Sequence, residues 1–148
     1  MGEAGDVIYV DADGQILGRM ASKVAKLLLE GRRVVIVNAE KAVLSGPRRR
    51  VVEGYKLLLS VRTHRNPEKS GIRRPRSPIN IVRRAVRGML PMDRPKGREA
   101  FGRLRVYVGL PDAFKDKQLV KFEEADAGRL KGKYTTVGEV ARELGWSA

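Results

Sequence analysis

The chain contains no cysteine and only one histidine, His64, in 148 residues. Without thiols it can form no disulfide, thiolate metal site or cysteine nucleophile, and one histidine cannot by itself assemble a histidine-based metal centre. No run of about 18 apolar residues is present to cross a membrane, and residues 1–6 lack the basic start and apolar stretch of a secretory signal. We therefore expect a cytoplasmic protein with no membrane association, no bound metal and no cofactor.

Chemically labile and aromatic side chains are also scarce. Asparagine and glutamine together number five, and aromatic residues make up 5% of the chain, whereas 32% of the residues are charged. Few amides, no cysteine and abundant charge are the composition expected of a heat-adapted organism. The length suits one compact core, and no linker or internal repeat divides the chain, so we expect a single domain over residues 1–148.

Positive charge is abundant and unevenly distributed. The net charge is +14, and residues 41–105, the basic window, hold 19 Lys and Arg against 4 Asp and Glu. The flanks are balanced, with 5 against 6 in residues 1–40 and 7 against 7 in residues 106–148. A surface that meets only water mixes both signs, so this surplus indicates a polyanionic partner. Of these 19 basic residues, 15 are arginine, whose guanidinium can donate two hydrogen bonds to the oxygens of one phosphate. Nucleic acid is therefore favoured over an anionic membrane as the partner.

The basic window also indicates how a nucleic acid is bound. Its only aromatic residues are Tyr55 and Phe101, too few for a base-stacking platform. Contacts to phosphate and ribose of a folded nucleic acid fit better, and no small-molecule substrate is expected. The candidate RNA-binding residues are Lys41, Arg48, Arg49, Arg50, Arg62, His64, Arg65, Lys69, Arg73, Arg74, Arg76, Arg83, Arg84, Arg87, Arg94, Lys96, Arg98 and Arg103.

The first part of the chain has the pattern of an α/β fold. An apolar run at residues 7–10 predicts a buried strand, and apolar residues spaced by three and four over residues 17–28 predict a helix that ends before Gly31. Residues 34–37 are all apolar, as in a strand covered on both faces. We predict an α/β fold: a single three-layer domain with a small, mostly parallel central sheet flanked by helices, plus a long basic loop.

The long basic loop is residues 63–78, which show no periodicity and contain three prolines. Because this segment has little apolar surface to bury, we expect it to be ordered only by a bound RNA. A helix entered through Ser45-Gly46-Pro47 precedes the loop and carries Arg48, Arg49 and Arg50 in its first turn. The helix dipole disfavours cations there, which suggests a functional reason for their placement.

Capping residues and short apolar patterns predict further helices and strands. Ser77 is the predicted N-cap of a third helix with an arginine-rich outer face (Arg83, Arg84, Arg87) and an apolar inner face that includes Met89. Residues 42–44 predict a short strand, and residues 104–108 the last core strand. Residues 136–139 form a capping box for a short terminal helix, after which Trp146 is expected to pack on the body.

Two short motifs do not match the binding sites that they suggest at first. Gly14 and Gly18 lie between a strand and a helix, but their spacing matches neither a P-loop nor a dinucleotide fingerprint, so a tight turn is favoured. Asp6, Asp11 and Asp13 lack the additional oxygen ligands of a calcium loop and are expected at the strand end and turn.

Three segments of the chain resemble segments of one protein family and occur in the same order as in that family. They are residues 10–22 (VDADGQILGRMAS), 36–41 (IVNAEK), and 84–91 (RAVRGMLP) followed by 102–111 (GRLRVYVGLP). They are similar to the thirteenth protein of the large ribosomal subunit. This resemblance implies a single α/β domain that binds large-subunit ribosomal RNA beside neighbouring ribosomal proteins, joins assembly early and is not an enzyme. It also implies that arginines near residues 89–91 and 97–103 meet RNA.

Two departures place the chain within that family. The histidine- and glycine-rich middle segment of bacterial members is replaced by residues 64–76, and their His-Pro-His signature after the last strand is absent. The chain therefore resembles the archaeal and eukaryotic branch. The competing hypotheses, an RNA-modifying enzyme and a DNA-compacting protein, lack respectively a cofactor loop and apolar wedges in this sequence.

Overall fold

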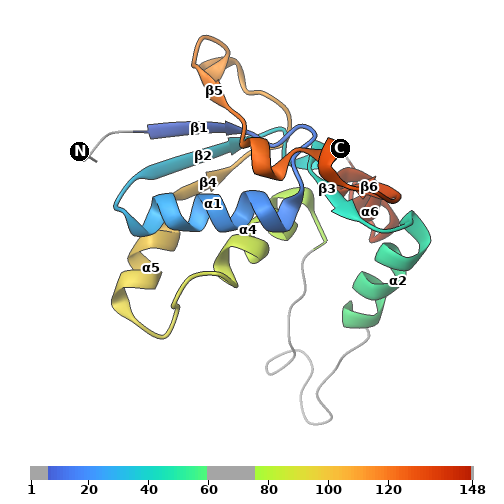
Figure 1. Cartoon of the computed structure of the whole chain (residues 1–148). Helices are drawn as coiled ribbons and strands as arrows, with labels where there is room; N and C mark the ends of the chain where they lie inside the picture. The colour runs from blue at the N-terminus through green and yellow to red at the C-terminus, as the bar shows by residue number, and fades with distance from the viewer. Residues whose placement is uncertain (1–6, 60–75, 148) are drawn as a thin grey trace.

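The structure is a computed structural model, and it describes residues 7–59 and 76–147. Its centre is a four-stranded sheet of β1 (Val7–Asp11), β2 (Arg33–Val37), β4 (Leu104–Val106) and β5 (Leu119–Val120), as Figure 1 shows. The strand order is β4-β2-β1-β5, and every neighbouring pair is parallel. The predicted α/β class with a small parallel sheet is confirmed.

Helix α1 (Leu17–Leu29) joins β1 to β2 and confirms the predicted strand–helix–strand unit. Its buried residues recur at helical spacing, so one stripe faces the sheet. The turn before it is tight: Gly14 has φ +71°, and the Gln15 N–H donates to the Ala12 carbonyl at 3.0 Å. Asp11 is a strand-end residue, as predicted, and its Oδ1 accepts from the Asp13 N–H at 3.0 Å and from Asn38 Nδ2 at 2.9 Å.

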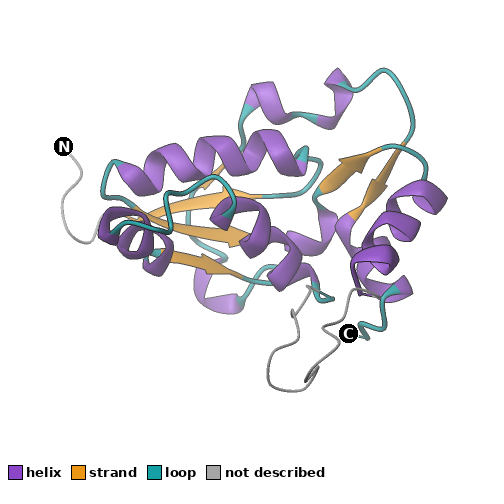
Figure 2. Ribbon diagram, turned by 90° about the horizontal axis from the view of Figure 1, so that it is seen from below, coloured by secondary structure: helices purple, strands orange, loops and turns teal. Residues whose placement is uncertain are grey.

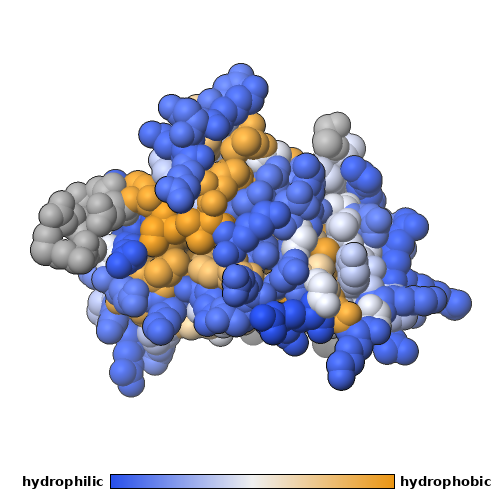
Figure 3. All heavy atoms as spheres, turned by 45° about the horizontal axis from the view of Figure 1, so that its top comes forward, coloured by the Kyte–Doolittle hydropathy of each residue, from blue (hydrophilic) through white to orange (hydrophobic). Residues whose placement is uncertain are grey.

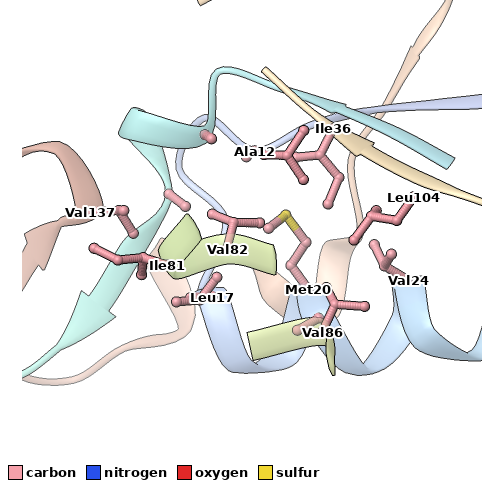
Figure 4. Packing of buried hydrophobic residues seen from close by; sticks show 14 of the residues in the cluster. Ala12, Leu17, Met20, Val24, Ile36, Ile81, Val82, Val86, Leu104 and Val137 are labelled. Carbon is pink, nitrogen blue, oxygen red and sulfur yellow. The ribbon is translucent and has the colours of Figure 1, made fainter. Parts of the chain in front are cut away.

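Helices α1, α4 (Pro78–Arg87) and α5 (Pro95–Gly102) cover one face of the central sheet (Figures 1 and 2). The main core lies between them, and in Figure 4 Met20 of α1 points toward Ile36 of the sheet with Val82 and Val86 of α4 beside it. This packing fixes α4 with one stripe buried, which leaves its opposite face to solvent.

The other face of the sheet has a thinner cover. Val10 belongs to the helix-side core, so Tyr9, its neighbour on the strand, points the other way. The Tyr9 ring lies 5.2 Å from the ring of Phe114, which in turn lies 5.4 Å from Tyr107. Phe114 ends the single turn η2 (Asp112–Phe114), so the third layer is this turn and its loop rather than an α-helix.

A second, two-stranded sheet forms one end of the molecule. Strand β3 (Val43–Ser45) pairs antiparallel with β6 (Tyr134–Thr136), beside α2 (Arg48–Leu59) and α6 (Val137–Glu143), as Figure 1 shows. The predicted capping box is present, since the Glu139 N–H donates to Thr136 Oγ1 at 3.2 Å and the Thr136 N–H donates to Glu139 Oε2 at 3.4 Å. Trp146 packs on the core as predicted. The remaining short turns are η1 (Ala39–Lys41), η3 (Glu123–Ala125) and η4 (Ala127–Arg129).

Several sequence predictions are corrected. β4 is not the last core strand, because β5 follows it at the opposite edge of the central sheet. Met89 does not face inward: α4 ends at Arg87, so the helical spacing stops, and Leu90 takes the buried position while Met89 is 43% exposed. Helix α5 and strand β6 were not predicted, and the short strand predicted at residues 42–44 is β3 (Val43–Ser45), which belongs to the second sheet. Residues 63–75 of the predicted basic loop lie outside the described residues.

Candidate nucleic-acid interface

Helix α4 presents one group of three candidate arginines. Its N-cap is Ser77, whose Oγ accepts from the Asn80 N–H at 3.2 Å. Arg83, Arg84 and Arg87 are exposed on the face opposite the buried stripe, as predicted. Arg84 and Arg87 lie in the last turn, where the helix dipole favours cations. The face can therefore hold a high density of positive charge at little cost to the helix.

Helix α5 adds three cations next to α4. Arg94, Lys96 and Arg98 are exposed, whereas Gly97 and Ala100 are buried against the body. The helix is tied to the preceding turn, because Arg98 Nη1 donates to the Met92 carbonyl at 3.1 Å.

One contact joins the two helices. The Arg83 guanidinium lies over the Phe101 ring of α5, with 5.0 Å between its central carbon and the ring centroid. Stacking of this kind orders an arginine while its outer N–H groups stay available. We call the exposed cations Arg83, Arg84, Arg87, Arg94, Lys96 and Arg98 the α4–α5 surface.

Three of the six cations of the α4–α5 surface, Arg87, Arg94 and Lys96, have no carboxylate partner among the described residues. Cations without a carboxylate partner are available to the phosphates of a polyanion. The surface is thus suited to phosphates.

The N-terminus of α2 carries a second group. Arg48, Arg49 and Arg50 are all exposed, and no acidic residue lies in the first turn. Arg48 pairs with a carboxylate oxygen of Glu143 on α6, and Arg49 Nε lies 3.2 Å from Glu53 Oε1 one turn along α2. These carboxylates offset part of the conflict with the helix dipole.

The other candidate residues have different surroundings. Arg103 is half-buried, and its Nη2 donates to the Leu28 carbonyl at the end of α1 at 2.6 Å. Lys41 is exposed at the end of η1, and Arg76 is exposed just before α4. Arg62, His64, Arg65, Lys69, Arg73 and Arg74 lie outside the described residues.

The side of the molecule that carries β5 is different in character. Its lysines already have partners: Lys115 Nζ lies 2.8 Å from Asp112 Oδ1, Lys121 Nζ lies 3.9 Å from Asp11 Oδ2, and Lys117 lies over the Tyr9 ring at 6.0 Å. Figure 3 shows a continuous apolar area on this side, next to a hydrophilic projection. The uncompensated positive charge is therefore concentrated elsewhere.

Other kinds of site are not apparent in the described part of the chain. It contains no group of three or more His, Asp or Glu side chains that could hold a metal ion. None of its helices is long and apolar enough to span a bilayer. Two side chains have a shifted pKa: burial raises that of Tyr55 on α2, and the Thr135 hydroxyl, which donates to Glu139 Oε2 at 2.6 Å, lowers that of Glu139.

Comparison with known proteins decides the family. The family model described as "Ribosomal protein L13" matches residues 5–113, which include β1, α1, β2, α4, α5 and β4. The chain belongs to this family. The resemblance found in the three sequence segments is thereby confirmed.

Relatives of the L13 family match far more of the chain. "Large ribosomal subunit protein uL13" of Sulfurisphaera tokodaii is 59% identical over 139 residues, which cover 94% of each chain. The protein of the same name from Saccharolobus solfataricus is 58% identical over 141 residues, covering 95% of this chain and 94% of its own length. That of Methanococcoides burtonii is 47% identical over 137 residues, covering 92% and 96%. These archaeal relatives confirm the predicted branch.

Sequence reasoning missed part of the basic surface. Lys131 and Lys133 belong to the flank of balanced charge, but the Gly46 N–H donates to the Lys133 carbonyl at 2.8 Å, close to the start of α2. The β-prone run Tyr134-Thr135-Thr136 was the only local signal for this pairing. A strand of three residues gives no indication of its partner, so the neighbourhood of these lysines with Arg48–Arg50 could not be foreseen.

Proposed function

We propose that this chain is a structural, non-catalytic component of the large ribosomal subunit that binds the subunit's ribosomal RNA through phosphate contacts and helps early assembly. The observation that carries the proposal is the α4–α5 surface, on which Arg87, Arg94 and Lys96 have no carboxylate partner among the described residues. The proposed location is the cytoplasmic ribosome, and neighbouring large-subunit proteins are a second class of partner.

The chemistry of the surface supports RNA rather than a small anion. Its cations extend over two helices rather than converging on one point, which suits a row of phosphates. Arg83 is held in place by Phe101, and Arg98 is held by the Met92 carbonyl, so less side-chain entropy is lost when they bind. Membership of the L13 family supports ribosomal RNA as the partner.

The test is a salt titration of binding between the purified protein and a large-subunit ribosomal RNA transcript. If roughly six to ten phosphates are engaged, affinity falls about 10³- to 10⁵-fold between about 50 and 200 mM salt. A nearly flat salt response would refute the proposal.

A matched pair of triple variants localises the contact. We expect Arg83→Glu with Arg87→Glu and Lys96→Glu to weaken binding strongly and to reduce the slope of log affinity against log salt. Lys115→Glu with Lys117→Glu and Lys121→Glu changes the net charge equally but alters lysines that already have partners, so it should matter less. Equal losses in both variants would contradict the assignment of the surface. Co-sedimentation of the protein with large subunits in a native lysate tests the ribosomal location.

A further inference from the structure

Tyr134 differs from every other aromatic residue of the chain. The sequence has three Phe, one Trp and four Tyr, all within the described ranges. Seven of these eight side chains are half-buried, whereas Tyr134 is 52% exposed. Tyr134 is therefore the aromatic ring of this chain that is most available to a partner.

The second sheet leaves the ring of Tyr134 uncovered. Tyr134 is the first residue of β6, and its partner in the register is Ser45, the last residue of β3. Cross-strand partners project on the same face of an antiparallel pair, about 5 Å apart, so the side chain next to the ring is a short serine. Gly46, the next residue, has no side chain and takes φ +112° to begin the turn into α2.

The β3–β6 pairing brings exposed cations from two parts of the chain close to this position in the backbone. Lys131 and Lys133 lie just before Tyr134, and Arg49 and Arg50 follow Ser45 at the start of α2; all four are exposed. Figure 1 shows the start of β6 beside the end of β3 and the beginning of α2. Arg48 and Arg49 have carboxylate partners in Glu143 and Glu53, whereas Arg50, Lys131 and Lys133 form no ion pair with described residues.

We propose that Tyr134 and the cations around it form a second RNA subsite, in which the ring stacks on one unpaired nucleobase while Arg50, Lys131 and Lys133 bind the flanking phosphates. This inference rests on the proposed RNA-binding function and adds a mode of contact to it. The basic window contains no exposed aromatic, and the antiparallel β3–β6 pairing supplies one from outside that window. An aromatic face with adjacent cations is the arrangement by which proteins hold single-stranded nucleotides.

The experiment compares the full-length protein with Tyr134→Ala, Tyr134→Phe and Tyr134→Leu in the same salt titration with the large-subunit RNA transcript. Loss of one base–aromatic stack reduces affinity about 5- to 150-fold. We expect that loss for Ala and for Leu, and near-normal binding for Phe, which keeps a stacking face. The salt slope should stay that of the wild type in all three, because the ring neutralises no phosphate, whereas Lys131→Glu with Lys133→Glu should lower it.

Three control measurements test the specificity of the binding loss, the folding of the variants and the contact with a nucleotide. Val120→Ala, at an apolar residue 37% exposed on the β5 side, should bind as the wild type does. Circular dichroism melts should show the Tyr134 variants folded, since about half of the ring is in solvent. Ultraviolet cross-linking of the wild-type complex should give a nucleotide adduct on the peptide that contains Tyr134.

Three outcomes overturn the inference: normal binding by Tyr134→Ala, normal binding by Tyr134→Leu, or no adduct at this peptide. Normal binding by the Leu variant would make the ring a general apolar contact, as for a protein neighbour. In each of these cases wild-type binding with a steep salt slope leaves the proposed function intact. Absence of salt-dependent binding by the wild type would refute the proposed function itself.

Discussion

Gly97 provides a quantitative test of how the α4–α5 surface is built. The residue is buried in α5, where the helix passes over Pro91. A Cβ at this position would lie 2.0 Å from the Pro91 carbonyl oxygen and 2.4 Å from its carbon, and the first distance is 1.4 Å short of ordinary contact at 3.4 Å. Both atoms belong to the backbone, so no side-chain rotation can relieve the clash. The substitution Gly97→Ala must displace α5 from the preceding turn.

The expected cost follows from what that displacement disturbs. Overpacking of this kind costs about 1–3 kcal/mol. The same Pro91 oxygen accepts from the Arg94 N–H at 3.0 Å, and loss of this hydrogen bond adds about 1 kcal/mol. The higher helix propensity of alanine returns about 0.5–1 kcal/mol. We therefore expect Gly97→Ala to lower the free energy of unfolding by about 1–3 kcal/mol and the melting temperature by several degrees.

Gly102 is the matched control. It ends the same helix and is exposed, and a Cβ there would meet nothing within 4 Å. Gly102→Ala should therefore be neutral or stabilise the protein by up to about 1 kcal/mol. Urea unfolding followed by far-UV circular dichroism measures both variants. If Gly97→Ala is as stable as the wild type, or if the two variants are equally destabilised, close packing of α5 on Pro91 is not what requires glycine.

Two further predictions concern stability. Because the folded state lowers the pKa of Glu139, mainly through the Thr135 hydroxyl, its carboxylate contributes stability that is fully present above the unfolded pKa and is lost as pH falls through the lower folded value. Glu139→Gln, which keeps a capping side chain, should therefore destabilise the protein at neutral pH and lose that effect in acid; parallel pH–stability curves would contradict this. The scarcity of labile residues predicts that the isolated protein, in moderate salt, stays folded above the mesophile melting range of about 45–65 °C; a cooperative melt within that range by circular dichroism would argue against a heat-adapted origin.

The parts of the fold that sequence predicts are those fixed by local patterns. Helix α1 and strands β1 and β2 have strong periodicity or continuous apolar runs, and their observed bounds differ from the prediction by one residue at most at each end. Strand β5 has two residues and exists because β1 offers it a free edge, with Tyr9 opposite Leu119. Such a strand carries no periodic signal of its own, since tertiary pairing creates it.

The candidate site also has features that the local sequence predicts and features that only the fold determines. Counting charge by position treats every arginine of the basic window alike, but the structure assigns them different tasks. Arg103 donates to the Leu28 carbonyl, and Arg105 Nη1 donates to the carbonyls of Gly102 and Leu104 at 2.9 and 2.8 Å. Arg103 is half-buried as well, so fewer of its donors can reach a phosphate than those of Arg98, which is exposed and donates to one carbonyl.

Counting charge along the sequence also underestimates the positive surface contributed by residues 106–148, in which acidic and basic residues are equal in number. Equal numbers of acidic and basic residues in residues 106–148 suggest a neutral surface only if both signs lie together. In the fold, Lys115 and Lys121 meet carboxylates on the β5 side, while Lys131 and Lys133 are carried by β6 to the start of α2 and meet none among the described residues. A nucleic acid responds to charge gathered on one surface rather than along the sequence. The RNA interface proposed for this chain therefore depends as much on the pairing of two three-residue strands as on the arginine content of its middle third.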